Sequence, residues 1–320
     1  MRHLFAASLL VCAASASAWA AVDQALLDLV PPGTRIVTSV DVDQAKNSPF
    51  GQYLLSKIST QDHNFEQLIQ QTGFDPRRDL HDFVFASAGP ENDMAQSRFA
   101  VIVRGNFDQN HIRATAQTKG ASVQNYHGYD LFISKSDRHT AFAFTEAQIM
   151  VMGDVATVQQ ILANRAYHTG LDPQLQQMVS TVSAANDAWF ASVMPGSYLA
   201  DHVKQQANQS AAQALQGVLQ SSGGIQFGSV IRVSLDATAR SPKDAQSLSD
   251  VIRFLGSLVQ MNRQKGPNAE NLASAVDAMT LDTDGDAVHV SISLPEQAVE
   301  QLANVGMHGG GFIPVDPHRH

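Results

Sequence analysis

The sequence contains a single cysteine, Cys12, which lies in an N-terminal segment that we expect to be removed. The mature chain would then contain none, which excludes disulfides, thiolate nucleophiles and zinc sites built from cysteines. A fold without these links depends on its apolar core alone. A chain of about 300 residues can meet this condition, because folding buries about 75% of its unfolded surface. The length fits one large domain or two ordinary ones.

The N-terminal segment has the three parts of an export signal. Arg2 and His3 form a short basic start, and residues 4–14 are an apolar run. Ala18-Trp19-Ala20 supplies the small-x-small pattern that signal peptidases recognise, so cleavage is predicted after Ala20. Residues 1–20 are therefore predicted to be a signal peptide, and the mature protein is expected to be periplasmic or secreted.

Two alternatives fit this segment less well. A membrane anchor needs about 20 apolar residues, and Ser15 and Ser17 interrupt the run before that length. A lipidated Cys12 would normally follow a small residue, whereas Val11 is bulky. The rest of the chain has no second long apolar run, so no transmembrane segment is expected after cleavage.

The charge of the chain argues against two classes of partner. The formal net charge is −9, and the 21 basic and 30 acidic side chains are spread along the sequence without a basic stripe. Nucleic acid and anionic membrane surfaces are poor partners for that balance. The hydrophobic fraction of 44% is ordinary for a folded globule, which argues against disorder.

Hydrophobic periodicity divides the first part of the chain into helices and strands. Strands are predicted at residues 36–42, 83–86, 99–103, 123–126, 131–134, 141–145 and 149–152. Helices are predicted near 22–30, 49–58, 64–72, 108–118 and 155–163, with Ser48 and Asp108 as N-caps. The runs at 83–86 and 99–103 are apolar on successive residues, which predicts strands covered on both faces.

A similar order follows in the second part. A helix at 173–182 is expected before a strand at 189–193 and a long helix at 197–218, which residues 221–224 would end. One strand at 225–235 and a helix at 242–264, capped by Ser241, come next. A hairpin across Asp284-Gly285 joins strands at 278–282 and 288–294, and Pro295 begins the last helix.

These elements predict an α+β fold of two similar halves, each an antiparallel-rich sheet covered by helices on one face. The halves would span residues 21–170 and 171–305, followed by a flexible Gly/His tail at 306–320. Each half begins with a strand leading to a helix and ends with a hairpin leading to a helix. The closing helices, at 156–164 and 297–304, also read alike, which favours a duplication over a coincidence of common patterns.

Five stretches carry a resemblance to known sequences. They are Val30-Pro31-Pro32-Gly33-Thr34, Asn47-Ser48-Pro49-Phe50-Gly51, Thr72-Gly73-Phe74-Asp75-Pro76-Arg77-Arg78-Asp79-Leu80, the strand in 99–107 and Gly153-Asp154. Together they resemble a group of exported bacterial α+β proteins of unknown function, mainly in the first half of the chain. The resemblance implies a bacterial source and export, and it implies no activity.

Two strings of acidic residues are candidate ion sites. In the segment Asp282-Thr283-Asp284-Gly285-Asp286, an EF-hand would require Gly at the sixth position and Glu at the twelfth. Ala287 and Ser293 occupy those positions, so the string favours a hairpin turn over a calcium site. The segment Asp41-Val42-Asp43 ends a predicted strand, where acids more often cap a helix or stay solvated.

The 12 histidines include no His-Glu-x-x-His spacing. The best cluster is in the tail, where His308, His318 and His320 are weak candidates for Zn²⁺ or Ni²⁺. A flexible, solvated tail is the favoured interpretation. No metal site and no cofactor are therefore predicted.

Motifs for covalent and phosphate chemistry are missing from the sequence. There is no Gly-x-Ser-x-Gly elbow and no Gly-x-x-x-x-Gly-Lys loop. The segment Asp75-Pro76-Arg77-Arg78-Asp79 could bind an acidic partner, but a salt-bridged turn is favoured. Paired acids for glycoside hydrolysis need no local spacing, so they remain open.

The first functional hypothesis is an exported, non-catalytic protein that binds a protein partner or a ligand of the cell envelope or its surroundings. A hydrolase with scattered acids or a Ser-His pair is the second, and a structural or assembly factor of the envelope is the third. The sequence identifies no catalytic and no cofactor-binding residue.

Overall fold

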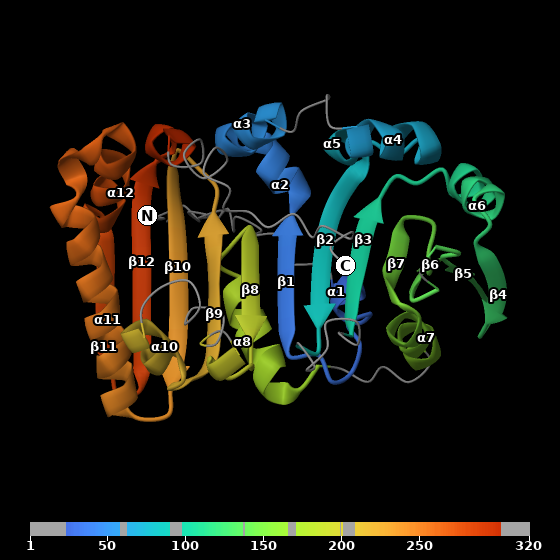
Figure 1. Ribbon diagram of the computed structural model, residues 1–320. Coiled ribbons are helices and arrows are strands. Elements are labelled where there is room, and N and C mark those ends of the chain that lie inside the picture. Colours follow the sequence, from blue (N-terminus) through green and yellow to red (C-terminus); the bar gives the residue numbers. More distant parts are fainter. Residues whose placement is uncertain are drawn as a thin grey trace, which may run out of the picture.

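Twelve strands form one continuous antiparallel sheet in the computed structural model of the protein (Figure 1). The structure describes residues 24–57, 63–89, 98–136, 138–165, 171–198, 200 and 209–301. The predicted signal peptide with Cys12 and the tail with His308, His318 and His320 lie outside the described residues. No helix among the described residues is long and apolar enough to cross a membrane.

The strand order across the sheet is β11-β12-β10-β9-β8-β1-β2-β3-β7-β6-β5-β4. The strands of the first half are β1 (Ile36–Asp41), β2 (Leu80–Ser87), β3 (Phe99–Gly105), β4 (Ser122–Tyr126), β5 (Tyr129–Ile133), β6 (Thr140–Phe144) and β7 (Ile149–Asp154). Those of the second half are β8 (Ala188–Ser192), β9 (Val218–Gln226), β10 (Val230–Ala239), β11 (Met279–Asp284) and β12 (Ala287–Pro295). The two halves meet where β1 pairs with β8.

The helices before the midpoint are α1 (Gln24–Leu27), α2 (Val42–Asn47), α3 (Pro49–Lys57), α4 (His63–Thr72), α5 (Pro76–Asp79), α6 (Gln109–Thr118) and α7 (Val155–Asn164). Those after it are α8 (Pro173–Ser183), α10 (Gln209–Leu215), α11 (Pro242–Met261), the short 3₁₀ helix η2 (Arg263–Lys265) and α12 (Pro267–Asp277). Residues 296–301 are helical as well.

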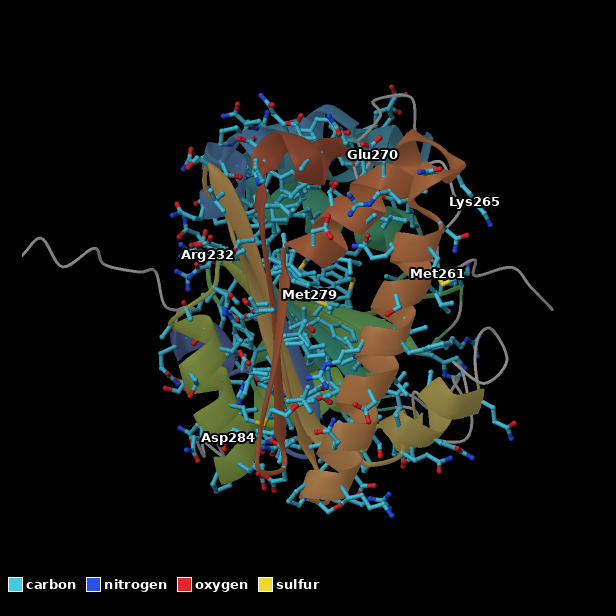
Figure 2. All side chains as sticks on the ribbon, turned by 90° about the vertical axis from the view of Figure 1, so that its left-hand side faces the viewer. Arg232, Met261, Lys265, Glu270, Met279 and Asp284 are labelled. Carbon is cyan, nitrogen blue, oxygen red and sulfur yellow. The ribbon has the colours of Figure 1, made fainter. Side chains whose placement is uncertain are left out.

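The two faces of the sheet carry different helices. Face B, which presents Val37 and Trp189, is covered by α1, α7 and α8 and forms the larger apolar cluster. Face A, which presents Ile36 and Phe190, is covered over the second half by α10 and α11. Figure 2 shows α11 and the yellow-green α8 on opposite sides of the sheet.

The α+β class and the antiparallel sheet confirm the coarse prediction. Helices lie on both faces of one continuous sheet, so the expectation of helices on one face of each half is wrong. The physical reason is alternation: β8 presents apolar side chains in both directions, Trp189 toward face B and Phe190 toward face A, and each set needs a cover.

Local helix signals were predicted correctly. Asp108 accepts a hydrogen bond from His111 N (3.0 Å), and Ser241 Oγ accepts one from Asp244 N (3.2 Å), so both residues are N-caps. Ser48 Oγ likewise accepts from Gly51 N at the start of α3 (2.9 Å). These signals depend only on near neighbours in the sequence.

The region 197–235 was predicted wrongly in two places. Residues 221–224, expected to end a helix, lie inside β9, and the run 225–235 is divided between β9 and β10 with a bend at 228–229. Gly223 fits a strand here because an added Cβ would collide with the carbonyl oxygen of Ser234 and lie 3.0 Å from the ring of Phe190. Glycine therefore marks a close approach at this position, not a helix end.

Candidate functional site

An apolar cavity of about 250 Å³ lies between face A and helices α10 and α11. Its lining comes from five strands, two helices and the segment after β8. The lining residues are Ile36, Phe190, Ser192, Met194, Pro195, Gly196, Tyr198, Leu215, Val218, Ser221, Leu235, Ala237, Leu248, Ile252, Val288 and Val290. The cavity is the hollow part of the layer that covers the second half of the sheet.

The floor of the cavity consists of two neighbouring cross-strand rows. One row runs Val288–Ala237–Ser221–Ser192–Ile36, and the other runs Val290–Leu235–Gly223–Phe190. Small residues, Ala237, Ser221 and Ser192, occupy the middle of the first row. Because these short side chains do not fill the space beneath the helices, a hollow remains there.

The roof of the cavity is the inward side of α11. Leu248 and Ile252, four residues apart, point from this helix toward the sheet. Leu235 lies on the sheet beneath it and is nevertheless 39% exposed. A side chain in this position would be fully covered in a filled core, so its exposure confirms that the layer is incompletely packed.

The described lining carries three polar side chains, Ser192, Ser221 and Tyr198, and no carboxylate, histidine, lysine or arginine. The Ser192 hydroxyl accepts a hydrogen bond from Met194 N at 3.2 Å. Without a base beside it, a serine hydroxyl stays a weak nucleophile. The described lining is therefore suited to enclosing an apolar group.

The outward side of α11 is also apolar. Phe254, Leu258 and Met261 are 50%, 38% and 81% exposed, and Leu272 of the neighbouring helix α12 is 46% exposed. Figure 2 shows Met261 on the side of α11 that faces away from the sheet. These positions form a stripe at helical spacing that no described element covers.

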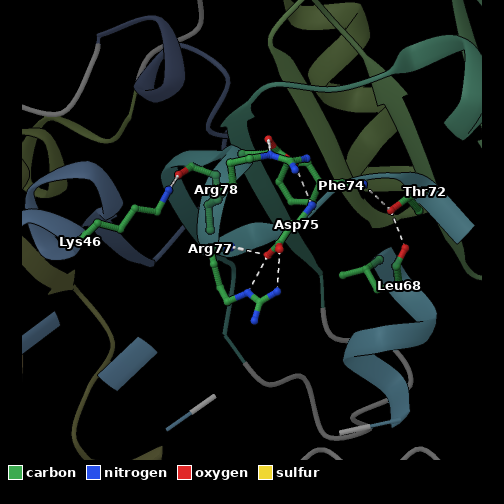
Figure 3. Close-up of polar contacts among 9 residues, drawn as sticks. Lys46, Leu68, Thr72, Phe74, Asp75, Arg77 and Arg78 are labelled. Atoms are coloured by element: carbon green, nitrogen blue, oxygen red, sulfur yellow. Dashed lines mark hydrogen bonds and ion pairs between the residues drawn. The ribbon is translucent and has the colours of Figure 1, made fainter. Parts of the chain in front are cut away.

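The charged segment 75–79 is a salt-bridged turn, which confirms the favoured prediction (Figure 3). Arg77 donates to both carboxylate oxygens of Asp75 (2.9 and 2.7 Å), and Arg78 donates to both of Asp79 (2.7 Å each). The two guanidinium groups hold the pKa values of Asp75 and Asp79 below their ordinary value. With its charges satisfied internally, this segment has little left to attract an acidic partner.

The acids at the end of β1 have structural roles. Asp41 caps α2 by accepting from Gln44 N (2.8 Å), as expected of a strand-end acid. Asp43 forms an exposed contact of 2.7 Å with Nδ1 of His81. Nearby, burial raises the pKa of Asp187, which accepts a hydrogen bond from Phe227 N at 2.6 Å. None of these side chains lines the cavity.

The string 282–286 forms the predicted hairpin. Asp284 pairs with Ala287 across a tight turn in which Gly285 has φ = +58°. Asp282 lies opposite His289 within the β11–β12 ladder. Among the described residues, no group of three or more His, Cys, Asp or Glu side chains is placed to hold a metal ion.

No pattern in the sequence predicted the cavity. Its residues come from seven elements between positions 36 and 290, and no local spacing connects them. The one available signal was the run Ser221-Ser222-Gly223-Gly224, where small residues occupy a strand that otherwise calls for bulky ones. Of these four residues Ser221 lines the cavity, whereas Gly223 lies close to the carbonyl oxygen of Ser234 and to the ring of Phe190.

Comparison with known proteins supports the fold and nothing more specific. No protein-family model matches the sequence, and no protein of curated function is significantly similar to it. A solved structure, described as crystal form I of TP0453, superposes with a TM-score of 0.51 and 11% sequence identity. The match covers 87% of this chain and 96% of that chain. The likeness at this identity concerns the architecture alone.

Proposed function

We propose that the protein is a non-catalytic binding protein that encloses an apolar ligand in the cavity beneath α11. The observation that carries the proposal is the hollow of about 250 Å³ with its almost wholly apolar lining. Ligand pockets are concave and mostly apolar, with a few polar groups that orient the ligand. The three hydroxyl-bearing side chains of the lining correspond to those few groups.

The size of the cavity indicates the size of the ligand. An apolar cavity of about 150 Å³ is large enough to bind benzene, which has six carbon atoms. In proportion, the cavity here has room for a chain of roughly ten carbon atoms. An alkyl chain or a compact ring system of that size would cover Leu235 and the serines of the floor.

The proposal is tested with 1-decanol and a neutral fluorescent probe of similar size, 1-aminonaphthalene. The wild-type protein should increase the probe's fluorescence, and decanol should displace the probe. Ala237→Leu places a larger side chain on the cavity floor and should remove both effects. Ala184→Leu, the same change at an exposed position after α8, should leave binding intact. Probe binding that Ala237→Leu does not reduce would contradict the assignment.

A second candidate function is the binding of a protein partner through the outward side of α11. Exposed apolar patches on soluble proteins mark interaction sites when they are contiguous. Phe254, Leu258 and Met261 follow one another at helical spacing and are 50%, 38% and 81% exposed. A pull-down from envelope extract tests this function, with the double variant Leu258→Ser/Met261→Ser as the control. The variant should lose the partner and keep ligand binding, because neither residue lines the cavity.

A hydrolase is less well supported by the site. Asp187 is the described carboxyl group whose pKa is raised, and it lies away from the cavity lining. Ser192 and Ser221 line the cavity, and its described lining contains no histidine. A catalytic serine needs a base within hydrogen-bond reach, so the described cavity supports binding better than hydrolysis.

We further propose that the protein acts after export, as the residues 1–20 indicate. Ala18-Trp19-Ala20 supports cleavage before Ala21. N-terminal sequencing of the protein from the periplasm or culture medium should give Ala21 as the first residue. A start at Met1 or a lipid on Cys12 would contradict this proposal.

The proposed duplication has support in the strand order. Outward from the β1–β8 pair, one side reads β1-β2-β3-β7-β6 and the other reads β8-β9-β10-β12-β11. In both halves, the helix that follows the third strand, α6 or α11, packs on face A. Superposition of residues 34–164 on 187–304 in an experimental structure tests the repeat. The duplication hypothesis is wrong if these strands do not overlay in the same order and direction.

A further inference from the structure

We propose that the cavity selects an amphiphile with an anionic head group, and that Arg35 binds this head group at the rim. The inference rests on the proposed function, because it assigns the chemical class of the ligand for the same cavity. One guanidinium group lies beside a lining whose described residues carry no charge.

The position of Arg35 is fixed by the backbone around it. Arg35 N donates to the carbonyl of Ser87 (2.8 Å), and Val193 N donates to the carbonyl of Arg35 (2.9 Å). The next residue, Ile36, lines the cavity. Arg35 therefore directly precedes a residue of the cavity floor, and its side chain reaches the cavity wall through its guanidinium end.

The guanidinium group lies over a ring of the cavity wall. Its central carbon is 6.0 Å from the ring centroid of Tyr198, which lines the cavity and is 41% exposed. A cation in this position is attracted by the face of the ring and held near it. The arrangement places one positive charge where an enclosed chain would meet solvent.

Arg35 has donors to spare for a ligand. A guanidinium carries five N–H donors, and the hydrogen bond that Arg35 makes from its side chain is a long one of 3.5 Å to the carbonyl of Val193. Most of the described arginines are bound to carboxylates. They are Arg77, Arg78, Arg104, Arg113, Arg165, Arg240, Arg253 and Arg263. Within the described part of the chain, no carboxylate forms an ion pair with Arg35.

This placement favours an anion over a neutral head group. The protein carries a net charge of −9, so its overall field repels anionic ligands and a local cation is needed to hold one. A guanidinium offers two parallel N–H groups that match a carboxylate or a phosphate. The ligand class is thus a chain of roughly ten carbon atoms, from the cavity size, that ends in a carboxylate or a phosphate ester.

The experiment compares decanoate with 1-decanol as competitors of the neutral probe, at pH 8, where decanoate is ionised. The wild-type protein should bind decanoate about tenfold more tightly, the effect expected of one charge-assisted hydrogen bond. Arg35→Gln should remove this preference and leave the affinity for decanol unchanged. Arg35→Lys should retain part of it, and Arg138→Gln, an exposed arginine of the first half, should retain all of it.

Three outcomes would overturn the inference, and they differ from failure of the proposed function. Equal affinity of the wild-type protein for decanoate and decanol contradicts the anionic preference without the use of any variant. An equal loss of affinity for decanoate and for decanol in Arg35→Gln would mean that Arg35 has a structural role only. An unchanged preference in Arg35→Gln moves the anion contact elsewhere. If neither ligand displaces the probe from the wild-type protein, the cavity itself is not the binding site.

Discussion

The two layers of the molecule are built from the same sheet and differ in how completely they are filled. On face B, Leu131, Val151, Val158 and Leu175 are fully buried and belong to one continuous cluster. On face A of the second half, Leu235 is 39% exposed, and the cavity lies beside the smaller buried cluster that packs α11 on the sheet. One layer maximises burial, whereas the other leaves room. The difference indicates that the first layer contributes more to the stability of the fold than the second.

Truncation of a large side chain should cost more on face B than beside the cavity. Leu162→Ala, at a residue that is 2% exposed in the filled layer, should destabilise the protein by about 3–5 kcal/mol. Leu248→Ala, in the cavity roof, should cost about 1–2 kcal/mol, because the site is less completely packed before the change. Urea denaturation monitored by circular dichroism measures both. Equal losses would show that the two layers are packed alike.

Enlargement of a small side chain should also destabilise the filled layer on face B more than the layer with the cavity, because only the second layer has space for added atoms. Ala143→Leu, at a fully buried position of face B, should destabilise by about 1–3 kcal/mol, because the added atoms have no space. Ala237→Leu should cost less than about 1 kcal/mol or stabilise the protein, since the side chain enters the cavity. Thermal unfolding of both variants gives the comparison. A large loss for Ala237→Leu would mean that the hollow is smaller than its lining indicates.

Loss of an ion pair should change the free energy of unfolding less than loss of a core side chain. The change should be larger for a buried pair than for an exposed one. Asp79→Asn should destabilise by about 1–2 kcal/mol at pH 7, because Asp79 is buried and accepts from Arg78 and from the backbone of Asp75. Asp250→Asn, at an exposed pair with Arg253, should change stability by less than about 0.5 kcal/mol.

The effect at Asp79 should depend on pH in a defined direction. The folded pKa of Asp79 is lowered, so its stabilisation is complete above the unfolded value of 3.8. It is lost as the pH falls through the folded pKa, where the carboxylate becomes protonated. The difference between wild type and Asp79→Asn should therefore shrink below pH 3.8, as urea unfolding across this range can show. A difference that stays constant would indicate that the charge of Asp79 contributes nothing.

The sequence predicted those features that depend on near neighbours along the chain. The caps at Asp108 and Ser241, the turn at Gly285 and the salt-bridged segment 75–79 are all decided within a few residues. The bend at 228–229 was missed because the apolar alternation continues through it. Ile225 and Val233 are directly paired across β9 and β10, so both share one face and the periodicity does not break.

The candidate site depends on contacts between distant segments. Whether a strand face is covered depends on where helices far along the chain are placed, and periodicity does not contain that information. The strands at 83–86 and 99–103 were predicted to be covered on both faces, yet Phe85 and Phe99 on face A are only partly buried. Local patterns could not predict the cavity for the same reason, because its floor joins positions 36, 192, 221, 237 and 288.

The alternation along β8 has a consequence for how the molecule can change over time. Trp189 and Ala191 belong to the filled layer, while their immediate neighbours Phe190 and Ser192 belong to the cavity. Side chains on opposite faces do not touch, so substitutions in the two layers should have nearly additive effects on stability. The cavity can therefore acquire a new shape by changes that leave the other layer intact. The packing of face B and the shape of the cavity are in this way inherited as two nearly independent properties of one strand.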